Sequence, residues 1–275
     1  MSTIVIKLGG GEGIDPTSTT REIASLVRAG QRVVLVHGGS HETNTLSAAL
    51  GHPPRTITSP GGQQSRRTDR QTLETFMMAY CGKVNKTVVE SLRAAGVDAV
   101  GLSGLDAGVW IGARKTAIRA VEDGRTVIIR DDLSGRVESV DHAFLNLLLD
   151  AGRLPVLTPP AGTPEGIAIN VDADRAAAAT AIALGADELL LLSNVRGVLR
   201  DPADPGSLIE QVDPDSLDDA RTAARGRMKN KVLAAEEALR GGVPRVVIGR
   251  ADGDGAIARA RDGVGTVFAN QEVPA

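Results

Sequence analysis

The fold is decided by the stretch IVIKLGGG at residues 4–11. A short apolar run of this kind predicts a buried parallel strand over residues 4–7, and the glycines after it predict a tight turn that leads into a helix. Glycine lets backbone N–H groups approach an anion closely, and Lys7 adds a positive charge beside them. The chain therefore begins with a strand, a turn and a helix in the order that makes an anion site.

The same pattern recurs along the chain. Residues 33–40, VVLVHGGS, give a second strand over residues 33–36 and a second glycine turn. We expect further strands at residues 99–102, 154–157, 188–192, 245–248 and 266–268. Helical patterns alternate with them at residues 18–28, 42–50, 69–94, 142–151, 174–184 and 228–239. This alternation predicts an α/β architecture.

Two segments depart from that alternation. Residues 109–137 contain short alternating runs separated by glycine turns, which predict hairpins that project from the sheet as a lid over a substrate. Residues 201–206, DPADPG, are almost all turn formers and predict a loop.

Composition narrows the class of protein. The chain has 275 residues and a net charge of −3, which argues against nucleic-acid binding, since that requires a basic excess. Aromatic residues make up 2% of the chain, so the core must be aliphatic, and the single cysteine, Cys81, rules out a disulfide or a cysteine-based zinc site within one chain. A strand begins near the first residue and no apolar run reaches membrane-spanning length, so we expect a cytoplasmic protein without a signal peptide or a membrane segment.

Three more segments carry charged residues: SRRTDR at residues 65–70, NVDAD at 170–174 and GRMKNK at 226–231. With the two glycine turns, they closely resemble the amino acid kinase family over nearly the whole chain. HGGS, GHPPR at residues 51–55, SPGG at 59–62 and GLSGLD at 101–106 resemble the acetylglutamate kinases and the LysW-aminoadipate kinases within it. The resemblance implies a three-layer αβα sandwich with a mainly parallel central sheet. It also implies a substrate-binding and dimerisation lobe at residues 1–162 and an ATP-binding lobe at residues 163–275.

The resemblance assigns the catalytic roles to two lysines and one carboxylate. Lys7 would stabilise the transferring phosphoryl group, Lys231 would stabilise the negative charge that moves toward the leaving ADP, and Asp174 would hold both lysines in place. Lys229 is the rival for the second lysine, because it lies in the same segment. The two lysines would face different sides of a helix, and we prefer Lys231 because the family lysine is followed by an apolar helix, as Lys231 is by residues 232–235. Both assignments have structural alternatives. A lysine before a glycine turn, taken alone, is usually the solvated end of a strand, which is the alternative for Lys7. An acidic residue at the start of a helix is favoured by the helix dipole, which is the alternative for Asp172 or Asp174.

Substrate contacts follow from the same resemblance. Gly38 and Gly39 would contact the moving phosphoryl group and the acceptor. Arg66 would bind the α-carboxylate of the acceptor through its bidentate guanidinium, with Arg67 and Arg70 as rivals, and Asn170 would contact the amide or the α-carboxylate of the acylated amino acid. Each assignment has a purely structural alternative. Gly38 and Gly39 can be needed only for packing in a tight turn, and Asn170 can be an ordinary turn residue before a helix.

ATP contacts are expected at two places. The phosphates would lie on the first glycine turn, Gly9, Gly10 and Gly11, and the nucleotide would lie by the loop that contains Ser193, Asn194 and Gly197. Mg²⁺ would be held mainly by the phosphates, and we expect no metal cage built from protein side chains. His37 is expected to be structural.

The implied reaction is ATP-dependent phosphorylation of a side-chain carboxylate. A carboxylate is ionised at neutral pH and needs no general base, so catalysis must neutralise charge and align the reactants. The acceptor would be α-aminoadipate, or glutamate, linked to a small acidic LysW-like carrier protein in lysine or arginine biosynthesis. A basic rim would guide the carrier, although its members can equally be solvated surface residues: Arg55, Arg67, Arg70, Lys83 and Lys86.

Other functions stay open at this point. The main alternative is a kinase that acts on free N-acetylglutamate, and the residues do not fix the length of the acceptor side chain. A kinase for another acceptor, or a regulator that binds nucleotide or amino acid without chemistry, is a further alternative. The joint presence of Lys7, Asp174 and Lys231 argues against the regulator. We also expect a homodimer, with the helix at residues 69–94 as its interface, and no feedback by arginine.

Overall fold

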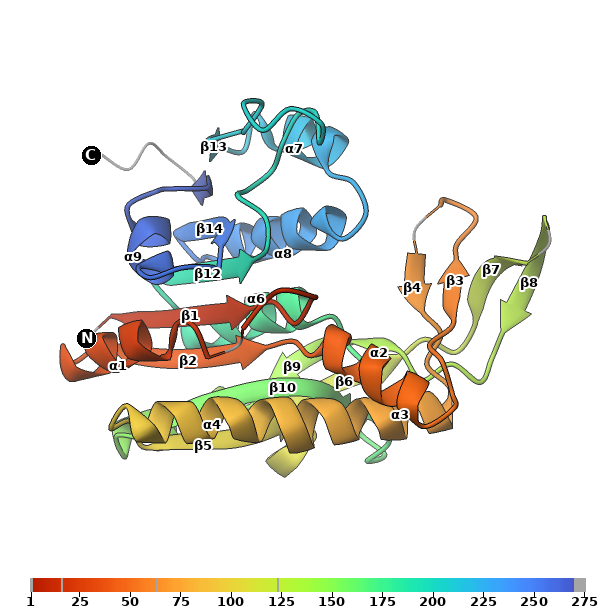
Figure 1. Cartoon of the computed structure of the whole chain (residues 1–275), viewed down its shortest axis with the longest axis horizontal. Coiled ribbons are helices and arrows are strands. Elements are labelled where there is room, and N and C mark those ends of the chain that lie inside the picture. Colours follow the sequence, from red (N-terminus) through yellow and green to blue (C-terminus); the bar gives the residue numbers. More distant parts are fainter. Residues whose placement is uncertain (1, 16, 63, 123, 270–275) are drawn as a thin grey trace.

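A computed structural model describes residues 2–15, 17–62, 64–122 and 124–269. Its main feature is an eleven-stranded sheet in the order β13-β15-β14-β12-β1-β2-β10-β6-β9, with β5 and β11 also paired to β10 (Figure 1). These strands are β1 (Thr3–Leu8), β2 (Arg32–His37), β5 (Ala99–Gly104), β6 (Trp110–Arg114), β9 (Gly135–Val140), β10 (Leu154–Gly162), β11 (Ala168–Ile169), β12 (Glu188–Ser193), β13 (Gln211–Val212), β14 (Arg245–Arg250) and β15 (Thr266–Ala269).

Helices connect and cover these strands. They are α1 (Thr20–Arg28), α2 (Ser40–Ala49), α3 (Arg70–Met77), the π-helix η1 (Met78–Val84), α4 (Asn85–Ala94), the short 3₁₀ turn η2 (Asp106–Gly108), α5 (His142–Asp150), α6 (Ala173–Leu184), α7 (Leu217–Ala223), α8 (Met228–Arg240) and α9 (Ala256–Arg261). Within the described residues, no helix is both long enough and apolar enough to cross a membrane.

β1 lies at the centre of the sheet and pairs in parallel with β12 on one side and β2 on the other. The antiparallel pairs of this sheet are β10–β11, β14–β15 and β6–β9. All six residues of β1 are buried, as expected for a parallel strand that is covered on both faces. The predicted α/β fold with a mainly parallel central sheet is therefore confirmed.

The alternation of side chains along β1 divides the core in two. Val5 belongs to a cluster with alanines of α6 and α8, whereas Ile4 and Ile6 belong to a cluster with residues of α1, α4 and α9. Successive side chains of a strand point to opposite faces of the sheet. Each face is therefore covered by helices, which makes the three layers (Figure 1).

Two small hairpins project together from one end of the sheet (Figure 1). One pairs β3 (Thr56–Thr58) with β4 (Gln64–Arg66), and the other pairs β7 (Ile118–Glu122) with β8 (Arg125–Ile129). They share a small buried cluster of Ile57, Ala120 and Ile129. We call these two hairpins the arm. The prediction of projecting hairpins within residues 109–137 is thus confirmed, and its role as a lid stays a prediction.

The structure also differs from the expected elements. The helix predicted over residues 69–94 is continuous, but its middle is the π-helix η1. The strands β3, β4, β11 and β13, the 3₁₀ turn η2 and the helices α7 and α9 were not predicted. The end of β10 coincides with the proposed lobe boundary after residue 162, while one sheet runs through both parts, so the division into lobes stays a prediction.

Candidate active site

The two glycine turns touch each other at the carboxyl ends of β1 and β2. A Cβ atom added to Gly10 would lie 2.0 Å from the backbone nitrogen of Gly39, so no side chain fits there. The carbonyl of Gly10 accepts hydrogen bonds from the Ser40 hydroxyl at 2.9 Å and from the His41 N–H at 2.8 Å. Gly38 N–H in turn donates to Leu8 O at 2.9 Å. The two turns therefore form one backbone surface at the start of α2.

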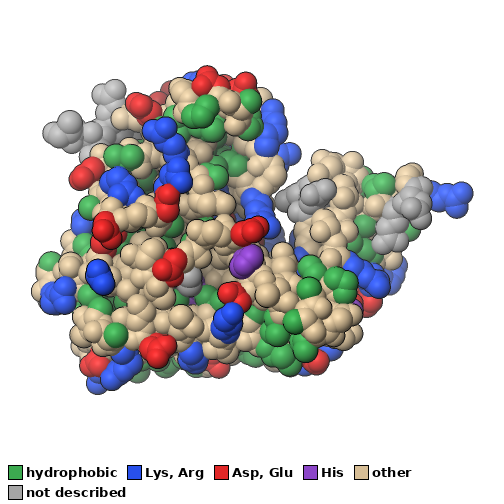
Figure 2. Space-filling model, in the orientation of Figure 1, with side chains coloured by type: hydrophobic (Ala, Val, Ile, Leu, Met, Phe, Trp, Pro, Cys, Tyr) green, Lys and Arg blue, Asp and Glu red, His purple; other side chains and the backbone are tan. Residues whose placement is uncertain are grey.

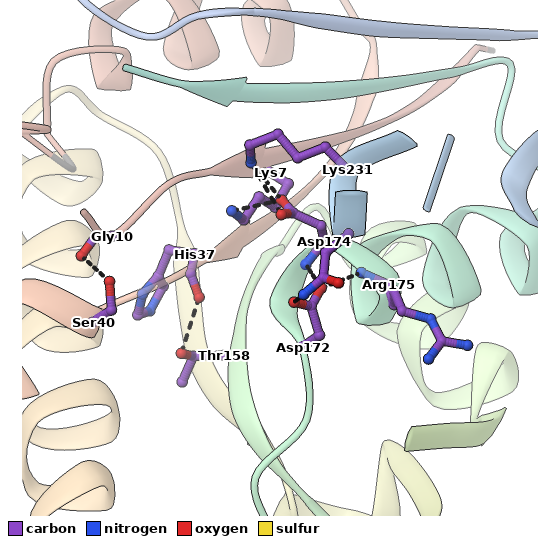
Figure 3. A network of polar contacts seen from close by, with 10 residues as sticks. Lys7, Gly10, His37, Ser40, Thr158, Asp172, Asp174, Arg175 and Lys231 are labelled. Carbon is purple, nitrogen blue, oxygen red and sulfur yellow. Dashed lines mark hydrogen bonds and ion pairs between the residues drawn. The ribbon is translucent and has the colours of Figure 1, made fainter. Parts of the chain in front are cut away.

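Three buried charged residues lie next to this surface. Lys7, at the end of β1, places its Nζ 2.7 Å from Asp174 Oδ1. Lys231, near the start of α8, places its Nζ 3.0 Å from Asp174 Oδ2 and 3.1 Å from Oδ1 (Figure 3). All three are at most 7% exposed. Two ammonium groups therefore share one carboxylate beside the glycine turns.

Burial and mutual attraction set the protonation of this triad. Burial opposes ionisation of Asp174, but the charges of Lys231 and Lys7 hold the pKa of its carboxyl far below the usual range. Burial also works against the charged form of Lys7, yet Asp174 outweighs it and raises the pKa of Lys7. The pKa of Lys231 is lowered by burial and by the charge of Lys7, although Asp174 opposes both. Asp174 is thus an anion at neutral pH, and Lys7 is a cation.

Asp172 holds the start of α6, from which Asp174 projects. Its Oδ1 accepts from the backbone N–H groups of Asp174 and Arg175, both at 3.0 Å (Figure 3), and its Oδ2 accepts from Asn230 Nδ2 at 2.8 Å. Such an N-cap satisfies amides that a helix start would otherwise leave unpaired. Because Asn230 precedes Lys231, the cap also ties the starts of α6 and α8 together.

The side chain of His37 stabilises the second glycine turn through a hydrogen bond to the turn's backbone. Its ring is fully buried, and burial lowers its pKa from 6.5 to about 4. Nδ1 lies 2.9 Å from Gly38 O, which can only accept, so Nδ1 carries the proton and Nε2 accepts from Asn85 Nδ2 at 3.1 Å. Asn85 also donates to Val156 O at 3.0 Å. The ring is therefore neutral and structural in its contacts, as expected.

Arg66 lies at the end of β4 and points toward the start of α2. Its Nη2 donates to Ser40 O at 3.3 Å and to Asn44 Oδ1 at 2.5 Å. Its Nη1 is buried and has no hydrogen-bond partner among the described residues. A buried donor without a partner is costly, and a carboxylate would satisfy it. Ser40 also donates to Gly10 O, so a single residue, Ser40, connects Arg66 to the first glycine turn.

Asn170 lies near this end of the site. Its Nδ2 donates to Thr68 Oγ1 at 3.2 Å, and its backbone pairs with Leu133 and Gly135. Thr68 follows Arg66 by two positions in the chain. The structure therefore brings the two predicted substrate-binding side chains to neighbouring segments.

The loop after β12 adjoins the first glycine turn. Gly9 N–H donates to Leu192 O at 2.8 Å, and the hydroxyl of Ser193 is buried without a partner among the described residues. Ser193 and the exposed Asn194 line a cavity of about 170 Å³ with residues 13–15 and 250–253. Gly197 instead packs against Thr266 at the start of β15, where an added Cβ would lie 2.6 Å from the hydroxyl oxygen.

Comparison with known proteins decides the family. The model of the amino acid kinase family matches residues 2–250. The chain belongs to the amino acid kinase family. It is similar to LysW-aminoadipate kinase of Deinococcus radiodurans, at 52% identity over 97% of this chain and 91% of the relative. It is also similar to acetylglutamate kinase of Methanopyrus kandleri, at 38% identity over 93% of this chain and 99% of the relative.

Solved structures agree on the fold. N-acetylglutamate synthase from Neisseria gonorrhoeae, solved with coenzyme A and N-acetyl-glutamate, has a TM-score of 0.79 and 27% identity to this amino acid kinase. The match covers 99% of this chain and 60% of the synthase chain. The present chain thus spans well under two thirds of the synthase.

The structure separates the rivals that the sequence left open in this amino acid kinase. Lys229 is exposed, and of the two lysines only Lys231 contacts Asp174. Each arginine keeps one buried donor without a partner among the described residues, Nη1 of Arg66 and Nε of Arg67. Arg67 Nη2, however, already donates to both carboxylate oxygens of Asp131 at 2.6 Å, whereas no carboxylate of the described residues pairs with Arg66. Geometry therefore favours Arg66 as the arginine that can still bind a carboxylate, and Lys231 as the lysine that belongs to the buried triad.

The predicted basic rim is largely occupied by ion pairs. Arg67 pairs with Asp131, Arg70 with Glu74 and Lys83 with Glu42. Lys86 donates to Asn85 Oδ1 and to Gly101 O. Of the five predicted residues, only Arg55 has no such contact among the described residues. Local carboxylates, a side-chain amide and a backbone oxygen thus contact four of the five members, and the role of the rim in guiding a carrier stays a prediction.

Two features of the site were missed. Asn44 holds Arg66, and Tyr80 packs on Gly39, where its ring lies 2.8–3.2 Å from the position of an added Cβ. Tyr80 is the only tyrosine in the chain, so its rarity was the one available signal.

Among the described residues, no group of three or more His, Cys, Asp or Glu side chains is arranged to hold a metal ion. Both oxygens of Asp174 already contact lysines. The donor set therefore fits Mg²⁺ only as an ion that arrives with a nucleotide.

Proposed function

We propose that this amino acid kinase uses ATP to phosphorylate the side-chain carboxylate of α-aminoadipate carried on a LysW-like protein, and that it accepts carrier-linked glutamate as a second substrate. The observation that carries the proposal is the buried triad Lys7–Asp174–Lys231 beside two glycine turns. The similarity to LysW-aminoadipate kinase over nearly the whole chain supports the choice of acceptor.

The proposed reaction needs charge neutralisation more than acid or base chemistry. An acceptor carboxylate oxygen forms a bond to the γ-phosphorus of ATP while the bond from that phosphorus to the bridging oxygen of the β-phosphate breaks. The electron pair leaves with ADP, the product is an acyl phosphate, and no proton moves. Two anions must therefore approach each other, and stabilising the negative charge in the transition state is the main task of the protein.

The triad suits this task. Asp174 keeps two ammonium groups in fixed positions, and their combined charge exceeds its own by one. We assign Lys7 to the phosphoryl group in transfer, because it adjoins the glycine turns, and Lys231 to the charge that develops on the leaving phosphate. The amides of the glycine turns would donate to the same oxygens.

Magnesium fits as a partner of the nucleotide. Mg²⁺ keeps several water ligands and is commonly bound through substrate phosphates with one or two carboxylates. The ion would neutralise phosphate charge, and Ser193 and Asn194 would position the nucleotide beside it.

The acceptor end of the site is defined by Arg66. Its unpaired Nη1 would bind the α-carboxylate, while Asn170 would contact the amide that joins the amino acid to the carrier. This arrangement orients the side-chain carboxylate toward the glycine turns through the contact of Arg66 with Ser40. A free acylated amino acid would satisfy the same two groups, so the carrier must be recognised elsewhere.

The arm offers that recognition surface. Five exposed cations lie on the two hairpins or beside them and have no ion-pair partner among the described residues: Arg55, Lys115, Arg119, Arg125 and Arg130. Figure 2 shows Lys and Arg side chains on the projecting arm. The chain as a whole has a net charge of −3, so this positive surface is local. It would attract an acidic carrier whose terminal amino acid enters beside β4.

The deciding experiment is ATP-dependent hydroxamate formation with the purified protein, which traps an acyl phosphate. The acceptors are carrier-linked aminoadipate, carrier-linked glutamate and free N-acetylglutamate, and Lys7→Ala is the inactive control. We expect activity on the carrier-linked acceptors and its loss in the variant. Activity confined to free N-acetylglutamate would overturn the carrier and identify an acetylglutamate kinase. ATP binding without activity on any acceptor would overturn the proposed reaction.

A further inference from the structure

Tyr80 occupies a position that the proposed chemistry has not yet used. It is 7% exposed, and the edge of its ring packs against Gly39 of the second glycine turn. The face of the Tyr80 ring stacks on the ring of Phe76, with ring centroids 3.9 Å apart and an angle of 23° between the planes. The ring is therefore fixed between a core residue and the turn that we assign to the phosphoryl group.

The backbone that presents Tyr80 is unusual. Residues 70–94 form one unbroken helical run, and the seven residues Met78–Val84 within it are π-helical. A π-turn adds a residue to the turn and rotates the following side chains relative to a regular helix; such turns often occur at functional sites. Here the π-turn contains Tyr80, and the residue just after it, Asn85, holds His37. The π-helical segment and the residue after it thus contact the second glycine turn in two ways, directly through Tyr80 on Gly39 and indirectly through Asn85 and His37 on Gly38.

The phenol of Tyr80 is buried beside the second glycine turn. Burial raises the pKa of Tyr80, while the Gly39 backbone, Arg66 and Lys7 act to lower it. The phenol is thus a neutral donor beside Gly39, a residue that we assign to the acceptor and the phosphoryl group. A neutral hydroxyl can donate to a carboxylate without adding charge.

We propose that Tyr80 is a specificity-determining residue of the acceptor site, whose ring forms a wall along the acceptor side chain beside the second glycine turn and whose hydroxyl donates a hydrogen bond to the acceptor carboxylate. This inference rests on the proposed function for the identity of the acceptor. The rigid ring sets how far a carboxylate reaches from Arg66 toward the glycine turns. It therefore discriminates between acceptors that differ by one methylene group.

The test compares Tyr80→Phe and Tyr80→Leu with the wild type in steady-state assays on carrier-linked aminoadipate and glutamate, with KM measured separately for acceptor and ATP. Tyr80→Phe keeps the ring and removes only the hydroxyl, so we expect the acceptor KM to rise about tenfold while the ATP KM is unchanged. Tyr80→Leu removes the rigid wall, so we expect the ratio of kcat/KM between the two acceptors to change by about tenfold, the lower end of the discrimination that one methylene group gives in a pocket.

Cys81→Ser is the matched control. Cys81 lies on the same π-turn but donates to Pro159 O, and we expect this variant to leave both KM values unchanged. An acceptor KM within twofold of wild type in Tyr80→Phe would overturn the hydrogen bond, as would an equal rise in both KM values. An unchanged acceptor ratio in Tyr80→Leu would overturn the wall. If the wild type acts only on free N-acetylglutamate, the proposed function fails, and the same KM comparison on that acceptor still decides the role of Tyr80.

Discussion

At the scale of single residues, Lys231 and Lys229 form a natural matched pair. Lys231 is buried against Asp174, whereas Lys229, two positions earlier, is exposed. Removing one group that stabilises transition-state charge typically lowers kcat by about 10² to 10³. We therefore expect Lys231→Met to lose about that much of kcat, because Lys7 still neutralises Asp174 and the fold persists. Lys229→Met should keep near-wild-type kcat, and equal losses in the two variants would contradict the assignment.

His37 connects a single residue to stability at low pH. Burial lowers its pKa from 6.5 to about 4 in the folded state. Below pH 6.5 the unfolded chain therefore binds more protons than the native state, and stability falls as the pH drops until it passes the folded pKa. The full loss is roughly 3 kcal/mol. This contribution is present at neutral pH and above and is lost on acidification.

Urea unfolding at pH 7 and pH 5 measures this effect. We expect the wild type and the exposed-histidine control His142→Gln to lose similar free energy of unfolding between the two pH values. His37→Gln should start less stable, because its hydrogen bonds to Gly38 and Asn85 are changed, yet lose less on acidification. The same pH dependence in His37→Gln and wild type would exclude His37 as a source of acid sensitivity.

At the scale of elements, the arm carries the prediction about the carrier. Arg119 on β7 and Arg125 on β8 are exposed, and reversing both charges weakens attraction to an acidic partner. We expect Arg119→Glu/Arg125→Glu to raise the KM for carrier-linked acceptors about three- to tenfold, as exposed charges contribute up to about 1 kcal/mol each, with no change in the ATP KM. The effect should shrink at high salt. Arg21→Glu on α1, at the opposite end of the sheet, is the control, and a salt-independent rise in KM would contradict electrostatic docking.

The elements also show what sequence could and could not predict. β1 and β12 were predictable because parallel strands covered on both faces are continuous apolar runs. β3 and β4 were not, since three-residue strands around the turn formers at residues 59–62 carry too little pattern. The π-helix η1 leaves the helical character of residues 70–94 intact, so periodicity could not reveal it. Its presence is decided by how α3 and α4 pack against the rest of the chain.

For the whole molecule, the family resemblance supplied the site residues and the structure supplied their partners. Lys7, Asp174 and Lys231 lie far apart in the chain, and the fold brings their side chains together as ion pairs. The partners that stabilise the site, such as Asn44 for Arg66, lie outside the motifs. They depend on which elements become neighbours, and one sequence does not contain that information in local form.

The sheet that crosses the proposed lobe boundary predicts one cooperative unit. Trp110, the only tryptophan, is fully buried on β6 in the first part, and its Nε1 donates at 3.0 Å to Thr180 Oγ1 on α6 in the second. Its fluorescence therefore reports the contact between the two parts. We expect tryptophan fluorescence and far-ultraviolet circular dichroism to give the same urea midpoint, as for a two-state transition. A fluorescence midpoint clearly below that of circular dichroism would mean that the two parts separate before they unfold.

Thr180→Val tests the energy of that contact. The substitution keeps the shape of the side chain but leaves the buried indole N–H without its acceptor, which costs about 1–3 kcal/mol. Thr87→Val is the matched control, because both hydroxyls donate to the carbonyl four residues earlier, Thr180 to Ala176 O and Thr87 to Lys83 O, but Thr87 is exposed. We expect Thr180→Val to lower the urea midpoint seen by both probes equally, and Thr87→Val to leave it nearly unchanged. If Thr180→Val shifted only the fluorescence midpoint, the contact would stabilise the docking of two independent lobes, and the single-unit prediction would be wrong.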